Sequence, residues 1–149
     1  MNAMVATPPI ELRQCRVRLA AGPAAAGEAR GQVRAAIRDW DAPVDPDVAV
    51  LLVSELVTNA IMHETGETVT LGIRCFRSRL RVDVYDTSRS FPVATVAPGD
   101  AETGRGLMLV ATLATEWGFY QTPTGKSVYF TLLFEDGHTA PGDDSPVLD

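Results

Sequence analysis

The segment that follows Asp45-Pro46 places the strongest constraint on the fold. Aspartate is a favoured N-cap and proline a favoured first helical residue, so this pair predicts a helix start. Helical spacing continues to about Met62 or His63, and Gly66 lies just beyond. Almost the whole circumference is hydrophobic, so we expect a buried helix. The exception is a narrow strip near Asp47, Leu51, Ser54 and Thr58.

The rest of the chain alternates between strand and helix patterns. Period-two alternation predicts strands, and spacing of three or four residues predicts helices. We expect a strand over 10–19, helices over 24–40 and 107–114, and strands over 69–76, 80–86, 117–121 and 126–134. The two hairpins imply an antiparallel-rich sheet. The expected fold is α+β, a two-layer α/β sandwich with an antiparallel-rich mixed sheet covered on one face by about three helices.

Length and composition fit a single domain. The chain has 149 residues, of which 46% are hydrophobic and 21% charged, the balance of a globular protein. We expect a flexible leader over 1–9, a folded domain over 10–134 and an acidic, disordered tail over 135–149. Cys15 and Cys75 stand alone, which favours buried thiols over a metal or disulfide site.

The totals also exclude several classes of function. A net charge of −6 argues against direct nucleic-acid binding, which needs a basic face. The N-terminus lacks the basic and apolar regions of a signal peptide, and no apolar run approaches the ~20 residues of a membrane span. We therefore expect a cytoplasmic protein without a membrane segment.

Three polar residues interrupt the apolar helix. With successive residues 100° apart, Glu55, Asn59 and His63 fall within an arc of about 80°. Buried without partners, such groups would cost several kcal/mol. They form either an internal hydrogen-bond network or the floor of a ligand pocket. In the pocket, Glu55 would act as a base or orient a water, and Asn59 would coordinate a hard cation through its side-chain oxygen. His63 fits a helix cap as well as a site.

Two further segments have the composition of a ligand site. Asp86 ends a well-patterned strand before the irregular stretch 87–103, so it either initiates a turn or accepts a hydrogen bond from a ligand amine. Gly104-Arg105-Gly106 joins that stretch to a short helix that begins at Leu107. Two glycines let the backbone approach a ligand closely, and free N–H groups at a helix start attract phosphate oxygens. A plain loop-to-helix junction has the same composition, because Gly-x-Gly alone is a weak motif.

In their order and spacing, these segments resemble the motif boxes of the GHKL ATPase superfamily. The matching segments are Ser54-Glu55-Leu56-Val57-Thr58-Asn59-Ala60, His63, Asp86, Gly104-Arg105-Gly106-Leu107 and Gly125-Lys126-Ser127-Val128. More narrowly, the chain is similar to the small anti-sigma-factor serine kinases and their actinobacterial relatives. The resemblance covers roughly residues 13–134.

The resemblance implies a Bergerat-type site for ATP and Mg²⁺. Glu55 would be the catalytic base, Asn59 the Mg²⁺ ligand and Asp86 the acceptor of the adenine amine. Backbone groups of Gly104 to Leu107 would hold the phosphates, Ser127 would support the adenine end, and His63 would be a further nucleotide-binding residue. Family members phosphorylate a serine of a small anti-anti-sigma (STAS-type) protein and, as homodimers, sequester a sigma factor.

One departure from the family pattern leaves two functions open. Where the family's aspartate is followed by glycines, this chain has Asp86-Thr87-Ser88-Arg89-Ser90. The first alternative is an ATP-dependent serine protein kinase, and the second is a non-catalytic nucleotide-binding switch that regulates a protein partner. A histidine-kinase catalytic domain shares the fold, but the N-terminal region is too short for a dimerising hairpin with a phosphoacceptor histidine.

Overall fold

Five strands with alternating polar and apolar residues form one sheet in the computed structural model, which describes residues 11–63, 67–88 and 108–135. The strands are β1 (Glu11–Ala20), β2 (Thr68–Phe76), β3 (Arg79–Asp86), β4 (Glu116–Thr122) and β5 (Gly125–Leu133). Their order across the sheet is β1-β2-β3-β5-β4, and every neighbouring pair is antiparallel. The β3–β5 pairing therefore joins two hairpins that are distant in sequence.

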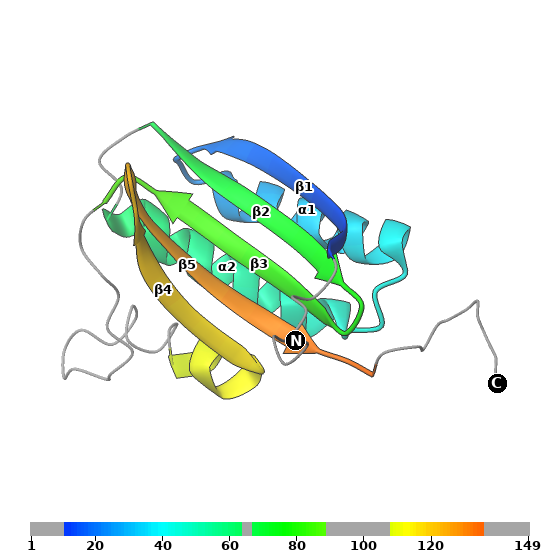
Figure 1. Cartoon of the computed structure of the whole chain (residues 1–149). Helices are drawn as coiled ribbons and strands as arrows, with labels where there is room; N and C mark the ends of the chain where they lie inside the picture. The colour runs from blue at the N-terminus through cyan, green and yellow to red at the C-terminus, as the bar shows by residue number, and fades with distance from the viewer. Residues whose placement is uncertain (1–10, 64–66, 89–107, 136–149) are drawn as a thin grey trace, which may run out of the picture.

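Helices form the second layer, behind the sheet in the view of Figure 1. They are α1 (Ala25–Trp40) and α2 (Pro46–His63), and residues 108–113 are also helical. The expected cap of α2 is confirmed, because Asp45 Oδ1 accepts a hydrogen bond of 2.9 Å from the backbone N–H of Asp47. Gly27 and Gly31 are tolerated within α1, where both are exposed.

The core lies between the two layers. The inward residues of β3 and β5 face each other in register as Leu80–Leu132, Val82–Phe130 and Val84–Val128. They are buried together with Leu52, Leu56 and Val57 of α2. Burial of each such side chain contributes about 1.5–3 kcal/mol, which fixes α2 against the sheet.

The strip predicted to be the non-core side of α2 has that position in the structure. Asp47, Leu51 and Thr58 are exposed, and Ser54 accepts a hydrogen bond of 3.0 Å from Arg30 of α1. The rotation of α2 that was predicted from its sequence is therefore correct. That rotation decides which face of the helix meets a ligand.

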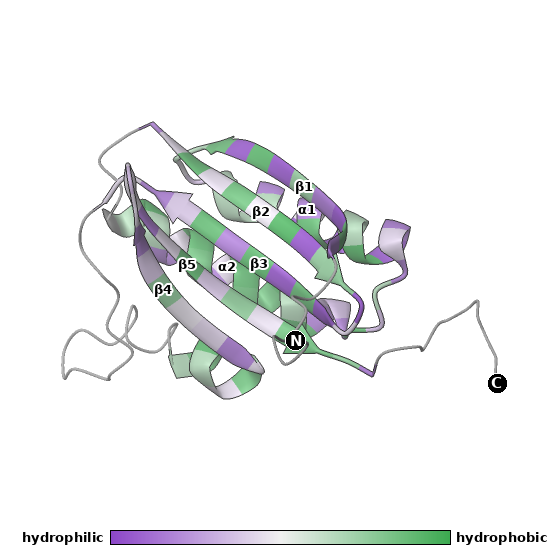
Figure 2. Ribbon diagram, viewed as in Figure 1, coloured by the Kyte–Doolittle hydropathy of each residue, from purple (hydrophilic) through white to green (hydrophobic). Residues whose placement is uncertain are grey.

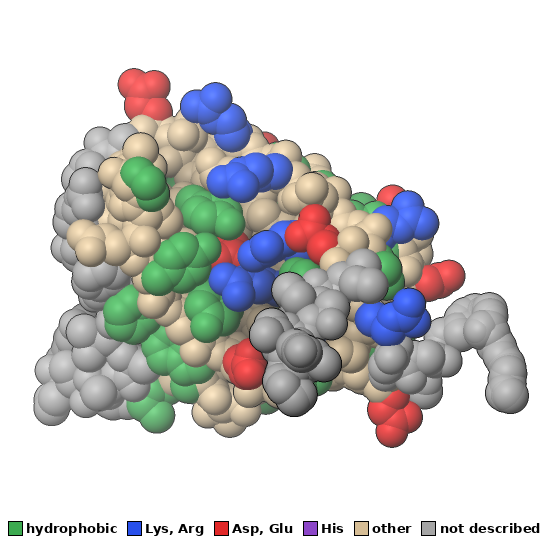
Figure 3. Space-filling model, viewed as in Figure 1, with side chains coloured by type: hydrophobic (Ala, Val, Ile, Leu, Met, Phe, Trp, Pro, Cys, Tyr) green, Lys and Arg blue, Asp and Glu red, His purple; other side chains and the backbone are tan. Residues whose placement is uncertain are grey.

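The other face of the sheet is polar and uncovered by α1 and α2, with alternating hydropathy along its strands (Figure 2). Arginine side chains gather across its centre, and hydrophobic side chains gather toward β4 (Figure 3). Arg81 stacks on Tyr129 with 3.9 Å from its Cζ to the ring centroid, and Arg16 stacks on Tyr85 at 4.6 Å. Cation–π contacts of this kind hold the guanidinium groups in place.

The α+β two-layer prediction is confirmed, with a sheet that is wholly antiparallel in the described residues rather than mixed. The leader at 1–9 and nearly all of the tail at 135–149 lie outside those residues. No helix in the described ranges is long and apolar enough to cross a membrane. Cys15 and Cys75 are free thiols, and burial raises the pKa of both, so neither is an activated nucleophile.

Candidate functional site

Two polar side chains of the buried helix α2 have no hydrogen-bond partner among the described residues. Asn59 is 6% exposed, and its Nδ2 has no hydrogen-bond acceptor among the described residues. Glu55, one turn earlier on the same face, is partly buried and forms neither a hydrogen bond nor an ion pair within the described part of the chain. The alternative of a mutual hydrogen-bond network therefore finds no support here. A buried amide without an acceptor among the described residues is a feature expected of a ligand site.

The predicted acceptor Asp86 lies at the end of β3 and points to the helix side of the sheet. It has the same strand parity as Val82 and Val84, and its side chain is 0% exposed. Its Oδ1 accepts a hydrogen bond of 2.8 Å from the backbone N–H of Ser88. The turn-initiating role of Asp86 is therefore real. It coexists with a buried carboxylate at the end of the sheet.

Lys126 of β5 is a site residue that the sequence analysis did not single out. It faces Asp86 across the β3–β5 ladder, and its Nζ lies 3.1 Å from Asp86 Oδ1. Both side chains are buried, at 1% and 0% exposure. The signal was available in the sequence, because Lys126 has the inward parity of Val128 and Phe130.

Ser127 lies on the opposite face of the sheet from Asp86. Its hydroxyl donates a hydrogen bond of 2.8 Å to Oδ2 of Asp83, a buried residue of the polar face. Asp83 also accepts a hydrogen bond of 2.7 Å from Arg81 Nε and one of 3.3 Å from Tyr120. The structure thus does not bring the Ser127 side chain together with the other predicted residues, because one step along a strand reverses the face.

Gly125 allows the start of β5 to pack directly on the end of β3. A Cβ at this position would overlap the carbonyl oxygen of Asp86 and lie 2.6 Å from Cα of Thr87. The close approach sets the position of Lys126, the next residue, relative to Asp86. Glycine is therefore needed here for space.

The remaining predicted residues lie wholly or partly beyond what the structure describes. His63 is the last residue of α2, and its side chain is outside the described part. Gly104, Arg105, Gly106 and Leu107 are also outside it, and the described helical segment begins at the next residue, Met108. Their predicted roles in nucleotide binding stay predictions.

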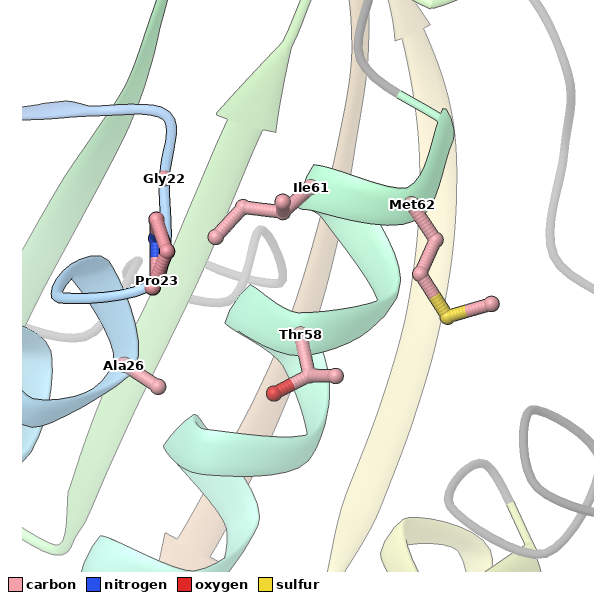
Figure 4. Close-up of a pocket in the computed structure, with 6 residues that line it drawn as sticks. All are labelled: Gly22, Pro23, Ala26, Thr58, Ile61 and Met62. Atoms are coloured by element: carbon pink, nitrogen blue, oxygen red, sulfur yellow. The ribbon is translucent and has the colours of Figure 1, made fainter.

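A separate open cavity of about 330 Å³ lies between the start of α1 and the C-terminal half of α2 (Figure 4). Its lining is mostly apolar: Gly22, Pro23, Ala26, Thr58, Ile61 and Met62. None of the predicted site residues lines it. The cavity adjoins the other side of α2 and is distinct from the Asn59 face.

The arrangement defines a class of protein. An antiparallel sheet packs on a helix whose acid and amide have no partner among the described residues, and a buried aspartate ends a central strand of that sheet. These are the elements of a Bergerat-type ATPase fold, with polar groups suited to a nucleotide at one end of the sheet.

The family comparison agrees with this class. The family model for the histidine kinase-like ATPase domain matches residues 12–132, and the chain belongs to this family. No curated protein matches the chain. The protein is therefore an ATP-binding, histidine kinase-like ATPase domain.

The donor chemistry of the site also fits a magnesium ion. Mg²⁺ prefers oxygen ligands and is commonly held by one or two protein oxygens together with substrate phosphates. The Asn59 amide oxygen supplies such a ligand on the face of α2 that also carries Glu55. The Nδ2 of Asn59, left without a partner among the described residues, agrees with a side chain placed for a ligand.

Proposed function

We propose that the protein is an ATP-dependent serine protein kinase of the anti-sigma type. It would phosphorylate a serine of an anti-anti-sigma (STAS-type) partner and sequester a sigma factor, as a homodimer. The proposal rests on one face of α2, where Glu55 and Asn59 have no partner among the described residues. This face belongs to an ATP-binding fold. An ATP-binding role alone would not require an acid without partners one turn from the amide.

The chemistry assigned to this chain is a single phosphoryl transfer. The bond between the γ-phosphorus and its bridging oxygen breaks, and a bond forms from that phosphorus to the serine Oγ. Glu55 accepts the serine proton, and ADP leaves. Mg²⁺, held by Asn59 and the phosphates, would neutralise charge on the phosphate oxygens. Asp86 would accept the hydrogen bond of the adenine amine.

A transfer assay tests this assignment. STAS-domain proteins with a candidate acceptor serine are incubated with labelled ATP and the kinase. We expect serine labelling by the wild type and a loss of about 10²–10⁴-fold in Glu55→Gln, the range of a general base. Glu28→Gln, which changes an exposed acid of α1, is the matched control and should label normally. Full labelling by Glu55→Gln would refute the assignment of the base.

The second function is a nucleotide-binding switch without catalysis. The observation that favours it is the segment after Asp86, where Ser88 is buried and its N–H is already bound by the aspartate. That N–H is therefore engaged within the protein. Nucleotide-dependent partner binding without phosphotransfer over hours would select this function over the kinase.

A further inference from the structure

The buried lysine at the end of β5 is the feature that the proposed function leaves unexplained. Lys126 is the only lysine in the sequence, among twelve arginines, and it is 1% exposed. Lysine is almost never fully buried unless it is paired. Its one partner among the described residues is Asp86, the residue assigned to the adenine amine.

The position of this pair argues against a purely structural role. The three preceding inward pairs of the β3–β5 ladder are apolar on both strands. An ion pair buried in such a row is often no more stabilising than apolar residues of the same volume, because both charges lose their hydration. The row changes from apolar to ionic only where it reaches the candidate site.

The ion pair determines what Asp86 can offer to a ligand. The ammonium group of Lys126 and the N–H of Ser88 both bind Oδ1, so the carboxylate has a fixed orientation. An adjacent positive charge also favours the ionised form of a carboxylate. An ionised carboxylate only accepts hydrogen bonds. It can therefore pair with an amine, and it repels a carbonyl oxygen at the same place.

We propose that Lys126 is a positioning residue that sets the base selectivity of the nucleotide site. It holds Asp86 as a fixed, acceptor-only carboxylate, so that the site takes 6-aminopurine nucleotides and rejects 6-oxopurine nucleotides. The inference rests on the proposed ATP site, and in particular on the role of Asp86 there. It adds the residue that makes Asp86 discriminate.

Calorimetric titration with two nucleotides tests the inference. ATP and inosine triphosphate differ at the position that Asp86 would read, and the triphosphate is common to both. We expect the wild type to bind ATP roughly 10-fold to 200-fold more tightly than inosine triphosphate, which is the contribution of one charge-assisted hydrogen bond. Lys126→Met keeps nearly the same side-chain length but removes the charge. In this variant the preference for ATP should fall at least tenfold. If Lys126 only supported the fold, its replacement would weaken the binding of both nucleotides by the same factor.

A second variant covers the case in which the single variant does not fold, because Lys126→Met leaves a buried carboxylate alone. Asp86→Asn with Lys126→Met removes both charges together, and an amide can both donate and accept. We expect this double variant to bind the two nucleotides with nearly equal affinity. Retention of the wild-type preference by the double variant, or by a folded Lys126→Met, would overturn the inference.

Selective isotope labelling of lysine adds a direct readout, since the chain has one ε-amino group. The NMR signal of the single lysine side chain should shift when ATP binds. It should shift less when inosine triphosphate is bound at saturation. An equal shift with both would contradict the inference. If the wild type binds neither nucleotide, the proposed function fails as well, whereas unchanged selectivity in a folded Lys126→Met variant removes only the role of Lys126.

Discussion

Asn59 carries a free-energy cost that the apolar residues around it avoid. Its Nδ2 is buried without an acceptor in the described chain, and a buried polar atom without a partner costs about 1–3 kcal/mol. Ala60 and Leu56, its neighbours on α2, are buried without such a cost. The site is thus built at the expense of the stability of the nucleotide-free protein.

This trade predicts opposite effects of one substitution on stability and on binding. Asn59→Leu should stabilise the nucleotide-free protein by about 1 kcal/mol, because the orphaned amide is removed. It should also abolish the stabilisation by Mg-ATP that we expect for the wild type. At a hundredfold excess over Kd this is about 2.7 kcal/mol of unfolding free energy, seen as a rise in the unfolding midpoint. Thermal unfolding with and without Mg-ATP measures both.

The adjacent exposed residue supplies the control for this experiment. Thr58→Ala should change stability by no more than about 0.5 kcal/mol and should keep the shift with Mg-ATP. An Asn59→Leu variant that is less stable than the wild type yet keeps the full shift would show that Asn59 is structural.

At the scale of elements, we expect the junction of β3 and β5 to be highly sensitive to substitution. Gly125 packs on the backbone of Asp86 and Thr87, and the next residue, Lys126, is hydrogen-bonded to Asp86. The backbone atoms in contact belong to two paired strands, so they cannot move apart without loss of ladder hydrogen bonds. The site is therefore mechanically coupled to the central strand pairing.

Two glycine substitutions with opposite expected signs test this coupling. Gly125→Ala should destabilise by about 3 kcal/mol, the upper part of the range for overpacking. Gly31→Ala should stabilise by about 0.4–1 kcal/mol, because Gly31 lies in α1 and nothing lies within 4 Å of an added Cβ. Urea unfolding gives both values. Equal effects of the two changes would mean that the close contact at Gly125 relaxes freely.

At the scale of the whole molecule, Tyr85 on the polar face of the sheet makes stability sensitive to alkaline pH. Burial raises the pKa of Tyr85 to about 12, and the nearby Asp83 and Tyr120 act in the same direction, while Arg16 opposes them. The ordinary pKa is 10.0, so the folded state favours the neutral phenol. The stability linked to Tyr85 is complete below pH 10 and is lost as the pH rises toward 12.

The corresponding variant isolates this contribution. Tyr85→Phe should lose unfolding free energy less steeply than the wild type between pH 10 and 12, since it has no phenol to ionise. Urea unfolding at a series of alkaline pH values supplies the comparison. Identical slopes for Tyr85→Phe and the wild type would contradict the prediction.

Local patterns in the sequence were sufficient for the elements of this fold and for much of its site. The Asp45 cap and the exposed strip of α2 follow from local rules, and both were predicted correctly. The same rules located Glu55 and Asn59 on one face. The strand order β1-β2-β3-β5-β4 could not be derived, because it depends on pairing between distant segments.

At the start of β5, the sequence pattern drew attention to Ser127 and not to its neighbour Lys126. Ser127 was predicted at the adenine end, whereas Lys126 is the side chain that reaches Asp86. A small polar residue next to glycine looks more suited to a ligand than a lysine that would have to be buried. Only the partner carboxylate, forty residues earlier in the chain, makes that burial acceptable.

The burial of Lys126 also limits how the protein can be chemically tagged. Enzymes that attach acyl groups or join proteins through isopeptide bonds at lysine need an accessible ε-amino group. The only one in this chain is 1% exposed and bound to a carboxylate. Conjugation at lysine therefore requires that β5 first leave the sheet, so such tags would mark the unfolded chain and spare the folded one.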